Sequence, residues 1–591
     1  MKKLALLFLF PVLSGPLAAG DQLQPIVVTA TRMELPADEV LAPTVVIDRE
    51  QIERSMASDI AELLRFHAGL ELGRNGGPGQ ATSLFIRGSD SNHALVLVDG
   101  VEINPGTIGG AALQNIVPHL IERIEIVKGP RSALYGSEAI GGVVNIITRQ
   151  NAGLELSIGG GRYGTRSAAL SAGLGNDEQT VSASIGTLSS DGFPTRDTDG
   201  APDRGYTNRS AGLNAATTIG GADLSLRHWQ SEGNTEYLDF FVNPVDQDYR
   251  NRATALTVTL SPAAGWSSSI MLSAIADDID QQQSADTART DRNVVDWQNN
   301  VQAGMHNIVA GLYAAREQTR ALSFGTGFDE NTDIDALYLQ DYIDLSHGEL
   351  LLAARYTDHE TAGNNTTWNA EYGHRFANGW RLIGAIGSAF RAPDATDRFG
   401  FGGNPQLQPE QSASMEFGLD RVMGPHTLRI TAFRNTIDNL IEYVFDPVSF
   451  AGSNVNIARA RITGLDAGYR WRNDYWRVAA SVLLQNPHDL QNDTQLARRA
   501  RRSLTLNASR VFDVYTLGFD VLATSQRRDS PFSDTINSGY VLANLSAQMQ
   551  LTRNWSLQGK IENLLDTNYQ TAAGFRSAGR GLYLAARYRL H

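Results

Sequence analysis

The stretch LTVTL, residues 256–260, decides how this sequence folds, because apolar and polar side chains alternate along it. The same alternation recurs from about residue 152 onward, for example in LELSI (154–158), VSASI (181–185) and LSL (224–226). A strand with this pattern has one apolar face and one polar or small face, which suits a position between lipid and a water-filled lumen. No later stretch approaches the roughly 20 apolar residues that a spanning helix requires. The pattern therefore predicts a transmembrane β-barrel.

Turn signals indicate how many strands this barrel has. Ten tight turns alternate with eleven longer polar connections, which predicts 22 antiparallel strands with short turns on one rim and long loops on the other. A soluble all-β repeat protein is the alternative, but it offers no reason for turns and loops of unequal length. The turns lie at 175–178, 220–223, 261–262, 305–307, 346–348, 377–379, 424–426, 472–474, 512–513 and 552–554, and the long connections include 190–208, 232–250, 392–411, 485–501 and 527–538. Five tryptophans beside the turns fit an aromatic girdle at the membrane interface: Trp266, Trp380, Trp471, Trp476 and Trp555.

The N-terminus has the features of a secretory signal peptide in their usual order: a basic start (MKK), an apolar run and small residues at 18–20. We therefore expect residues 1–20 to be removed. A transmembrane helix is the alternative, but the apolar run is short and contains two prolines. The chain has no cysteine, so disulfides do not contribute to its stability, and its net charge of -14 argues against a nucleic-acid partner and suits cation binding.

The first 150 residues differ from the rest and read as a compact mixed domain. They predict a helix at 58–64 and strands at 84–88, 94–100, 124–129 and 143–147. A barrel of 22 strands is too wide for its own side chains to fill, so its lumen needs a plug. We therefore predict an all-β membrane protein with an N-terminal segment (21–32), a mixed α/β plug domain in the lumen (33–149) and a 22-stranded antiparallel transmembrane barrel (150–591).

Before the plug lies the short segment PIVVTA, made of Pro25, Ile26, Val27, Val28, Thr29 and Ala30. It is strand-prone and apolar, and a segment of this kind near a free terminus is a template for pairing with another chain. The alternative is that it forms the first strand of the plug.

Three segments, FIRGSDSNHALVLVDGVEIN (85–104), IERIEIVKGPRSALYGSEAIGGVVNIITR (121–149) and IENLLDTNYQ (561–570), resemble TonB-dependent outer-membrane transporters of Gram-negative bacteria. Within that family, LAPTVVIDREQI (41–52), RNGGPGQATSLFIRG (74–88), GSAFRAPDATDRFGFGGNPQLQPEQS (387–412) and ARITGLDAGYRW (460–471) are most similar to the cobalamin (vitamin B12) transporters. The resemblance implies that residues 25–30 are a TonB box, which pairs with the periplasmic protein TonB by strand addition. The chain has no phosphate-binding Gly-x-x-x-x-Gly-Lys motif, so the energy for import would come from that partner.

The resemblance also implies which residues contact cobalamin. Small residues suit close approach to a large rigid ligand, and the apex loops of a plug meet an incoming ligand first. For the apex residues the alternative is ordinary loop packing, and the arginine, which lies in ARRARR (497–502), could equally bind lipopolysaccharide phosphates. The implied contacts are Ala81, Ser83, Asp90, Ile108, Gly109 and Arg498.

Acidic residues in two connections on the long-loop rim predict calcium, which takes six to eight oxygen ligands. Cobalamin transporters of this type bind calcium in these loops, and the ion would order the loops for ligand capture. The spacing here is compressed, and Glu232 stands where the family has an aspartate. The expected ligands are Asp197, Asp199, Asp203, Glu232, Asp239 and Asp246.

Two further motifs do not support an enzyme. GPRSALYGS (129–137) places Arg131, Ser132 and Tyr135 together without a histidine partner, and GGGRYG (159–164) lacks the βαβ unit of a dinucleotide site. The chain ends on His591 where barrels of this kind usually end on an aromatic residue. We expect a monomeric cobalamin importer in contact with outer-membrane lipids and lipopolysaccharide, and the sequence leaves open whether phages or toxins also use its surface as a receptor. The alternatives are an importer of a ferric siderophore or haem and, from another class, a passive porin or adhesin.

Overall fold

The computed structural model describes residues 27–28, 32–33, 35–37, 39–150, 153–176, 178–198, 200–239, 241–446, 451–530 and 533–590. The predicted signal peptide, Pro25, Ile26, Thr29, Ala30, Asp199 and His591 lie outside these residues. Within the described part of the chain, no helix is long and apolar enough to cross a membrane.

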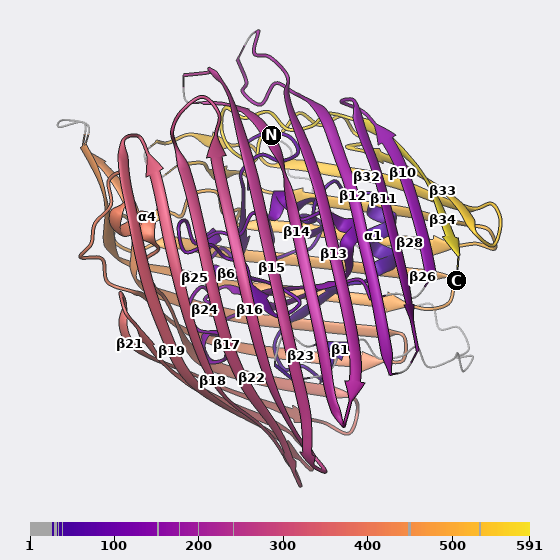
Figure 1. The fold of residues 1–591 in the computed structure, drawn as a ribbon, viewed down its shortest axis with the longest axis vertical. Helices are drawn as coiled ribbons and strands as arrows, with labels where there is room; N and C mark the ends of the chain where they lie inside the picture. The colour runs from indigo at the N-terminus through magenta and orange to yellow at the C-terminus, as the bar shows by residue number, and fades with distance from the viewer. Residues whose placement is uncertain are drawn as a thin grey trace, which may run out of the picture.

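The barrel predicted from alternation is confirmed. In the described residues 22 antiparallel strands form a closed cylinder, in which each strand pairs with its neighbour in the sequence and β10 pairs with β34 to complete the ring (Figure 1). The short strand β27 (Thr494–Gln495) pairs only with the end of β26, and β30 (Arg527–Arg528) and β31 (Ile536–Asn537) form a hairpin in a loop. The barrel strands are β10 (Gly153–Gly161), β11 (Thr165–Gly175), β12 (Gln179–Phe193), β13 (Arg204–Ile219), β14 (Ala222–Leu238), β15 (Pro244–Ala263), β16 (Trp266–Gln281), β17 (Thr287–Ala303), β18 (His306–Ser323), β19 (Thr326–Leu345), β20 (Gly348–His359), β21 (Gly363–Arg375), β22 (Trp380–Arg391), β23 (Glu410–Met423), β24 (His426–Asp446), β25 (Ala451–Arg472), β26 (Trp476–Asp489), β28 (Arg502–Val511), β29 (Tyr515–Thr524), β32 (Tyr540–Gln550), β33 (Trp555–Glu562) and β34 (Gly581–Leu590).

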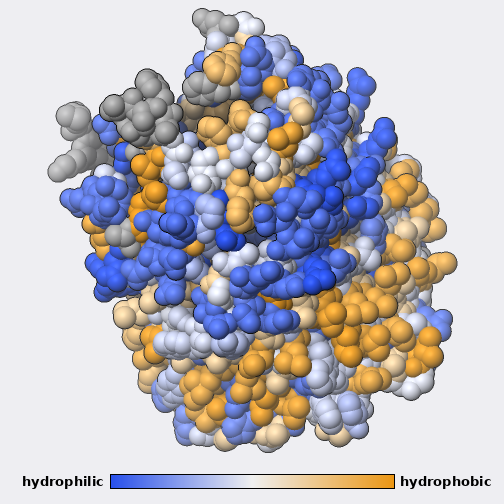
Figure 2. Space-filling view, turned by 60° about the vertical axis from the view of Figure 1, so that its left-hand side comes forward, coloured by the Kyte–Doolittle hydropathy of each residue, from blue (hydrophilic) through white to orange (hydrophobic). Residues whose placement is uncertain are grey.

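Alternate side chains of a barrel strand point outward and inward, as the sequence pattern predicts. In β15, Leu256 and Leu260 are 40% and 48% exposed on the outside of the barrel, whereas Ala253 and Ala255 face inward and are buried. Figure 2 shows the resulting apolar surface, which covers much of the lower part of the molecule below a polar upper part. Nine of the ten predicted turns coincide with short connections, and the tenth, predicted at 261–262, lies at 264–265 because β15 continues to Ala263. The five tryptophans lie beside these connections.

One predicted loop is wrong. Residues 232–250 are not a long loop, because β14 continues to Leu238 and β15 starts at Pro244. Glu232 pairs across the strands with Arg250, and Asn234 pairs with Asp248. The strands extend beyond the apolar band into water, where both faces are polar, and the alternation that marks a membrane strand is lost. The same reason explains why β26 continues to Asp489 in the predicted connection 485–501.

The plug lies inside the barrel, where the N-terminal part of the chain forms the indigo elements of Figure 1. Its central sheet has the order β3-β8-β9-β6-β7, and a separate hairpin is formed by β4 and β5. The predicted strands are confirmed. The plug strands are β3 (Thr44–Ile47), β4 (Leu70–Arg74), β5 (Thr82–Ile86), β6 (Ala94–Val98), β7 (Val101–Glu102), β8 (Ile121–Lys128) and β9 (Gly142–Thr148), and the helices are α1 (Arg49–Ser55), α2 (Ile60–Leu64) and α3 (Ser132–Tyr135).

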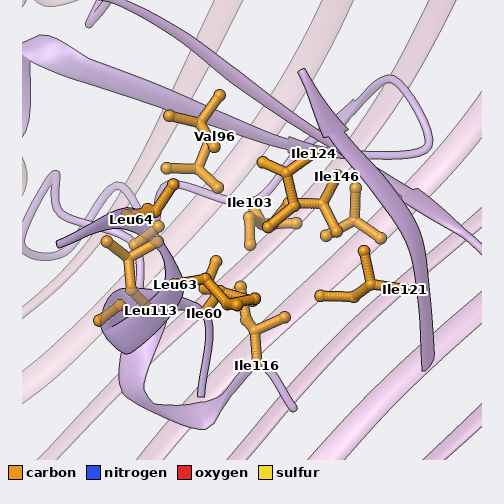
Figure 3. Packing of buried hydrophobic residues seen from close by; sticks show 14 of the residues in the cluster. Ile60, Leu63, Leu64, Val96, Ile103, Leu113, Ile116, Ile121, Ile124 and Ile146 are labelled. Carbon is orange, nitrogen blue, oxygen red and sulfur yellow. The ribbon is translucent and has the colours of Figure 1, made fainter. Parts of the chain in front are cut away.

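Helix α2 lies within the predicted helix 58–64 and is capped by Asp59. The side chain of Asp59 accepts a hydrogen bond from the backbone N–H of Glu62, which satisfies a free donor of the first turn. Helix α1, which the sequence analysis missed, has a capping box in which Asp48 and Gln51 bond to each other's backbone. Both helices pack on the sheet, and Ile60, Leu64 and Ile124 are completely buried in the core of the plug (Figure 3).

Buried ion pairs attach this plug to the barrel wall. Arg87 and Lys128 of the plug both reach Asp466 of β25, at 3.0 and 2.9 Å, and Arg131 reaches Glu371 of β21 at 2.7 Å. Removing one partner of a buried pair leaves an uncompensated charge, so these contacts hold the plug in one orientation.

Replacement of Ile124 by alanine tests the packing of the plug core. We expect Ile124→Ala to cost about 2–5 kcal/mol, because the cavity collapses only partly. Proteolysis of the detergent-solubilised protein at rising urea concentration should cleave the plug at lower urea while the barrel band remains. Leu337→Ala, which truncates a side chain that is 54% exposed on the outside, is the matched control. Equal urea profiles for the two variants would contradict this account.

Candidate functional site

The predicted ligand contacts lie on the outer side of the plug, near the long loops of the barrel. Ala81 is exposed and immediately precedes β5, and Ser83 lies in that strand. Opposite Ser83 is Gly73, and a Cβ atom at Gly73 would lie 3.6 Å from Cδ of Arg498. The structure therefore brings Ser83 and Arg498 to the same hairpin, although 415 positions of sequence separate them.

Asp90 has a structural role that the sequence did not indicate. Its carboxylate caps a short 3-10 helix (Ser91–His93) and forms an ion pair with Arg499 at 2.7 Å. Burial alone would raise the pKa of Asp90, but the Arg499 guanidinium and His93 outweigh it and hold this pKa well below its usual range. Asp90 at the plug apex therefore pairs with Arg499 and not with the predicted Arg498. The guanidinium of Arg498 lies 3.7 Å from Asp529.

The loop that contains Ile108 and Gly109 lies against the barrel helix α4 (Ala395–Phe399). The backbone N–H groups of Ala395 and Thr396 donate to the carbonyl groups of Gly106 and Thr107 at 2.9 and 3.0 Å. Gly109 is buried with a φ of +67°, and a Cβ atom there would lie 3.1 Å from Asp394, so only glycine fits this turn. Ile108 remains 47% exposed and available to a ligand.

A buried charged network holds α4 on the plug. Arg391, of which 1% is exposed, binds Asp394 and Asp397 at 2.8 and 2.6 Å and Glu410 at 3.3 Å. Glu410 in turn contacts the ring of His93 in the plug. The sequence analysis did not assign these residues, and the only signal was the spacing of Asp394 and Asp397, which form a capping box.

Two cavities lie between the plug and one wall of the barrel. The outer one, of about 60 Å³, is lined by Glu102, Glu138 and Arg355 beneath α4. Burial and the neighbouring Glu102 carboxylate raise the pKa of Glu138 to about 8. The inner one, of about 920 Å³, extends toward the short-turn rim. Tyr135 borders both, and the outer cavity is far smaller than the several hundred Å³ of a typical ligand pocket, so passage of a large ligand requires the plug to move.

The N-terminal segment meets this same wall at Arg32. Its guanidinium binds Asp296 of β17 at 2.7 Å and the Tyr338 hydroxyl of β19 at 2.8 Å. It also lies between the rings of Tyr135 and Tyr338, 4.8 and 4.5 Å from their centroids. Arg32 therefore joins the segment that follows residues 25–30 to the barrel wall and to the residue between the two cavities.

Only part of the predicted TonB box is described. Val27 and Val28 form β1, which pairs antiparallel with β2 (Leu35–Pro36). Strand β1 thus pairs with a strand of its own chain, and an edge strand of another protein could replace β2 as its partner. Pro25, Ile26, Thr29 and Ala30 lie outside the described residues.

The predicted calcium ligands do not converge in this structure. Glu232 pairs with Arg250 at 3.2 Å, and Asp197 pairs with Arg576 at 3.1 Å. Asp239 accepts hydrogen bonds from Asn243, Asp246 accepts one from Gln283, and Asp203 is exposed in the loop after β12. Within the described residues, which exclude Asp199, no group of three or more acidic or histidine side chains is arranged to hold a metal. The described residues do not fit a calcium ion in this arrangement.

Comparisons with known proteins agree with this architecture. The family model described as TonB dependent receptor-like, beta-barrel matches residues 149–564, and the TonB-dependent Receptor Plug Domain matches residues 36–143. Similar solved structures include the siderophore receptor PirA from Acinetobacter baumannii, which is 17% identical with a TM-score of 0.78, over 93% of this chain and 98% of that chain. A ferric enterobactin receptor variant (PfeA) from Pseudomonas aeruginosa in complex with enterobactin is 18% identical with a TM-score of 0.79, over 93% and 100% of the two chains. The copper transporter OprC is 16% identical with a TM-score of 0.78, over 93% and 98%.

The structural likenesses show the fold alone, because the identities are low. The barrel model, however, covers well over half of the chain, and the plug model covers the domain that fills its lumen. The chain therefore belongs to the TonB-dependent receptor family and is a TonB-dependent transporter of the outer membrane of Gram-negative bacteria.

Proposed function

We propose that this transporter imports cobalamin and related corrinoids into the periplasm. The observation that carries the proposal is that two of the segments most similar to cobalamin transporters, 74–88 and 387–412, contribute to the outer face of the plug. Segment 74–88 contains the turn between β4 and β5 and the whole of β5, with Ala81 exposed at the apex. Segment 387–412 contains α4, which is bonded to the apex loop of the plug. Segments 41–52 and 460–471 lie toward the short-turn rim instead, where Pro43, Thr44 and Asp466 line a cavity together with Gly379 and Trp380.

The charge balance of this face supports a ligand without a large negative charge. Arg499 is neutralised by Asp90, Arg498 lies near Asp529, and Arg527 lies 3.4 Å from Glu71. A corrinoid has a periphery of methyl and amide groups, which bind small residues and polar groups without a free cationic cluster. Ala81, Ser83 and Ile108 offer such a surface.

A second candidate is import of a ferric siderophore. It is favoured by the similar solved structures, two of which are siderophore receptors. An anionic ferric chelate would need arginines released from their carboxylate partners, because an ion pair already occupies most of their hydrogen-bonding capacity. Haem import and passive diffusion have no specific observation in their favour.

Energy for import would reach the plug through residues 25–30. TonB would replace β2 as the partner of this strand, and the pull would first act on Arg32, whose buried contacts with Asp296 and Tyr338 resist it. Withdrawal of Arg32 would leave Tyr135 without its stacked partner between the two cavities. No covalent change of the ligand is involved.

Calcium stays a prediction. Convergence of Asp197, Asp203, Asp239 and Asp246 would require the loops to rearrange and Asp197 to leave Arg576. Such a rearrangement on ligand arrival would order the outer loops, as the sequence predicts.

Binding titrations test the substrate. We expect cyanocobalamin to bind the purified protein at micromolar concentration or below, and a ferric catecholate and a ferric hydroxamate not to bind, in intrinsic fluorescence measurements with and without calcium. Ala81→Trp should weaken cyanocobalamin binding about tenfold by blocking the exposed apex, which corresponds to roughly 1.4 kcal/mol. Ala264→Trp, on the short-turn rim, is the matched control. If a ferric chelate binds and no corrinoid binds, cobalamin import is refuted and ferric siderophore import is supported.

Deletion of residues 25–30 separates binding from transport. We expect the deletion variant to bind cyanocobalamin normally and to lose uptake of radiolabelled cyanocobalamin by whole cells. A passive porin would continue to take it up.

The Arg32 contacts predict how firmly the segment is held. Breaking a buried pair costs about 3–5 kcal/mol, so Arg32→Ala should increase the mobility of a nitroxide attached at Val28→Cys, measured by electron paramagnetic resonance. Asp296→Asn should have the same direction of effect. Arg227→Ala, which breaks a different pair between barrel and plug at 3.0 Å from Asp99, should leave the spectrum unchanged. Equal spectra for the Arg32 and Arg227 variants would refute this role of Arg32.

A further inference from the structure

Three arginines face outward from the barrel directly beyond its apolar surface. The outward positions are identified by exposed leucines: Leu465 on β25, Leu484 on β26 and Leu504 on β28 are 39%, 44% and 44% exposed. Side chains two and four positions further along the same strand lie on the same face. Toward the long loops, Ala432 on β24 is followed by Arg434, and Leu465 on β25 by Thr463 and then Arg461. In the same direction, Leu484 on β26 is followed by Asn486, and Leu504 on β28 by Arg502.

The strand register places two of these arginines, Arg434 and Arg461, next to each other. Arg434 lies opposite Thr463, and Arg461 lies opposite Thr436, so the two arginines are diagonal neighbours on one face of the sheet. Diagonal neighbours are about 7–8 Å apart, within reach of long side chains. Arg502 lies opposite Leu484, two strands beyond β25. We call Arg434, Arg461 and Arg502 the arginine face.

None of the three guanidinium groups has a carboxylate partner in the part of the chain that the structure describes. The only acidic residue at an outward position of β24, β25, β26 or β28 beside them is Asp438, and it is occupied by Arg459. The Nε–H of Arg461 is buried and has no hydrogen-bond partner. The arginine face therefore carries uncompensated positive charge on a protein whose net charge is -14.

The wall formed by β14 to β19 is different. Its outward positions beyond the leucines carry both signs of charge, and four of its arginines lie within 4 Å of a carboxylate. The pairs are Arg250 with Glu232, Arg289 with Asp280, Arg316 with Asp333, and Arg320 with Asp291. An outward arginine at this height on the barrel can therefore have a carboxylate partner.

We propose that the arginine face binds the phosphate groups of a phosphorylated lipid in the outer leaflet of the membrane. The leucines below it contact acyl chains, so the first polar row above them lies at the level of the lipid headgroups. Guanidinium groups bind phosphate with paired, charge-assisted hydrogen bonds, and the diagonal pair Arg434 and Arg461 can share one phosphate. The lipid, rather than free phosphate, is the occupant because the leucines supply a surface for its chains.

Native mass spectrometry of the full-length protein in detergent tests this site, with lipid A (a diphosphorylated, acylated disaccharide) as the probe. Each arginine near an anionic headgroup contributes about fivefold to binding, so the triple variant Arg434→Gln, Arg461→Gln, Arg502→Gln should lose lipid A affinity by about 100-fold. The corresponding lysine variant should retain most of it. The matched control Arg250→Gln, Arg289→Gln, Arg316→Gln should bind as the unmodified protein does.

The source of the phosphate is separated by a second arm. Inorganic phosphate at millimolar concentration should neither bind measurably nor displace lipid A, and lipid A from which both phosphates have been removed should bind no better to the unmodified protein than to the triple glutamine variant. Equal lipid A affinity in the triple variant and the unmodified protein overturns the proposal, and so does an equal loss in the control. If the triple variant does not fold, the three single variants give the same decision, because each should lose about fivefold.

Discussion

A barrel of 22 strands cannot close its own lumen, and the rest of the structure follows from this constraint. The interior must be filled by a separate domain. The inner wall is largely polar because it faces a water-filled lumen. Contacts between plug and wall include buried ion pairs, such as Arg87 and Lys128 with Asp466, beside apolar clusters that contain residues of both, such as Leu41 of the plug with Leu351 and Ile383 of the barrel. Such pairs orient the plug firmly while both partners are present, and each is lost separately when a force acts on one end.

The two ends of the plug use this chemistry differently. At the inner end, Arg32 connects the segment after residues 25–30 to Asp296, Tyr338 and Tyr135, so a pull on the terminus acts directly on the wall that borders both cavities. At the outer end, Arg391 and Glu410 hold α4 on the apex loops, and Asp90 binds Arg499. A ligand at the apex and a partner at the terminus therefore act on the same rigid body from opposite sides.

On the outside of the barrel, arginines with and without a carboxylate partner both occur. On β14 to β19, arginines such as Arg250 and Arg316 are paired with carboxylates, which suits strands that rise into water. On β24 to β28, Arg434, Arg461 and Arg502 have no carboxylate partner among the residues that the structure describes. In the proposed lipid site, the headgroup phosphates would supply the opposite charge to these three arginines.

The sequence by itself determined the barrel, the number of its strands, nine of the ten predicted turns and the plug, because alternation and turn residues are local signals that neighbouring residues carry. It also located the apex residues Ser83 and Gly109 on the outer side of the plug. Local signals failed where strands leave the membrane, since Glu232 lost its alternating context there and was assigned to a loop. Only the tertiary structure decided that Arg499 rather than Arg498 pairs with Asp90, that α4 covers the apex loop and that Arg32 binds Asp296, because these partners lie hundreds of positions apart and only barrel closure around the plug brings them together.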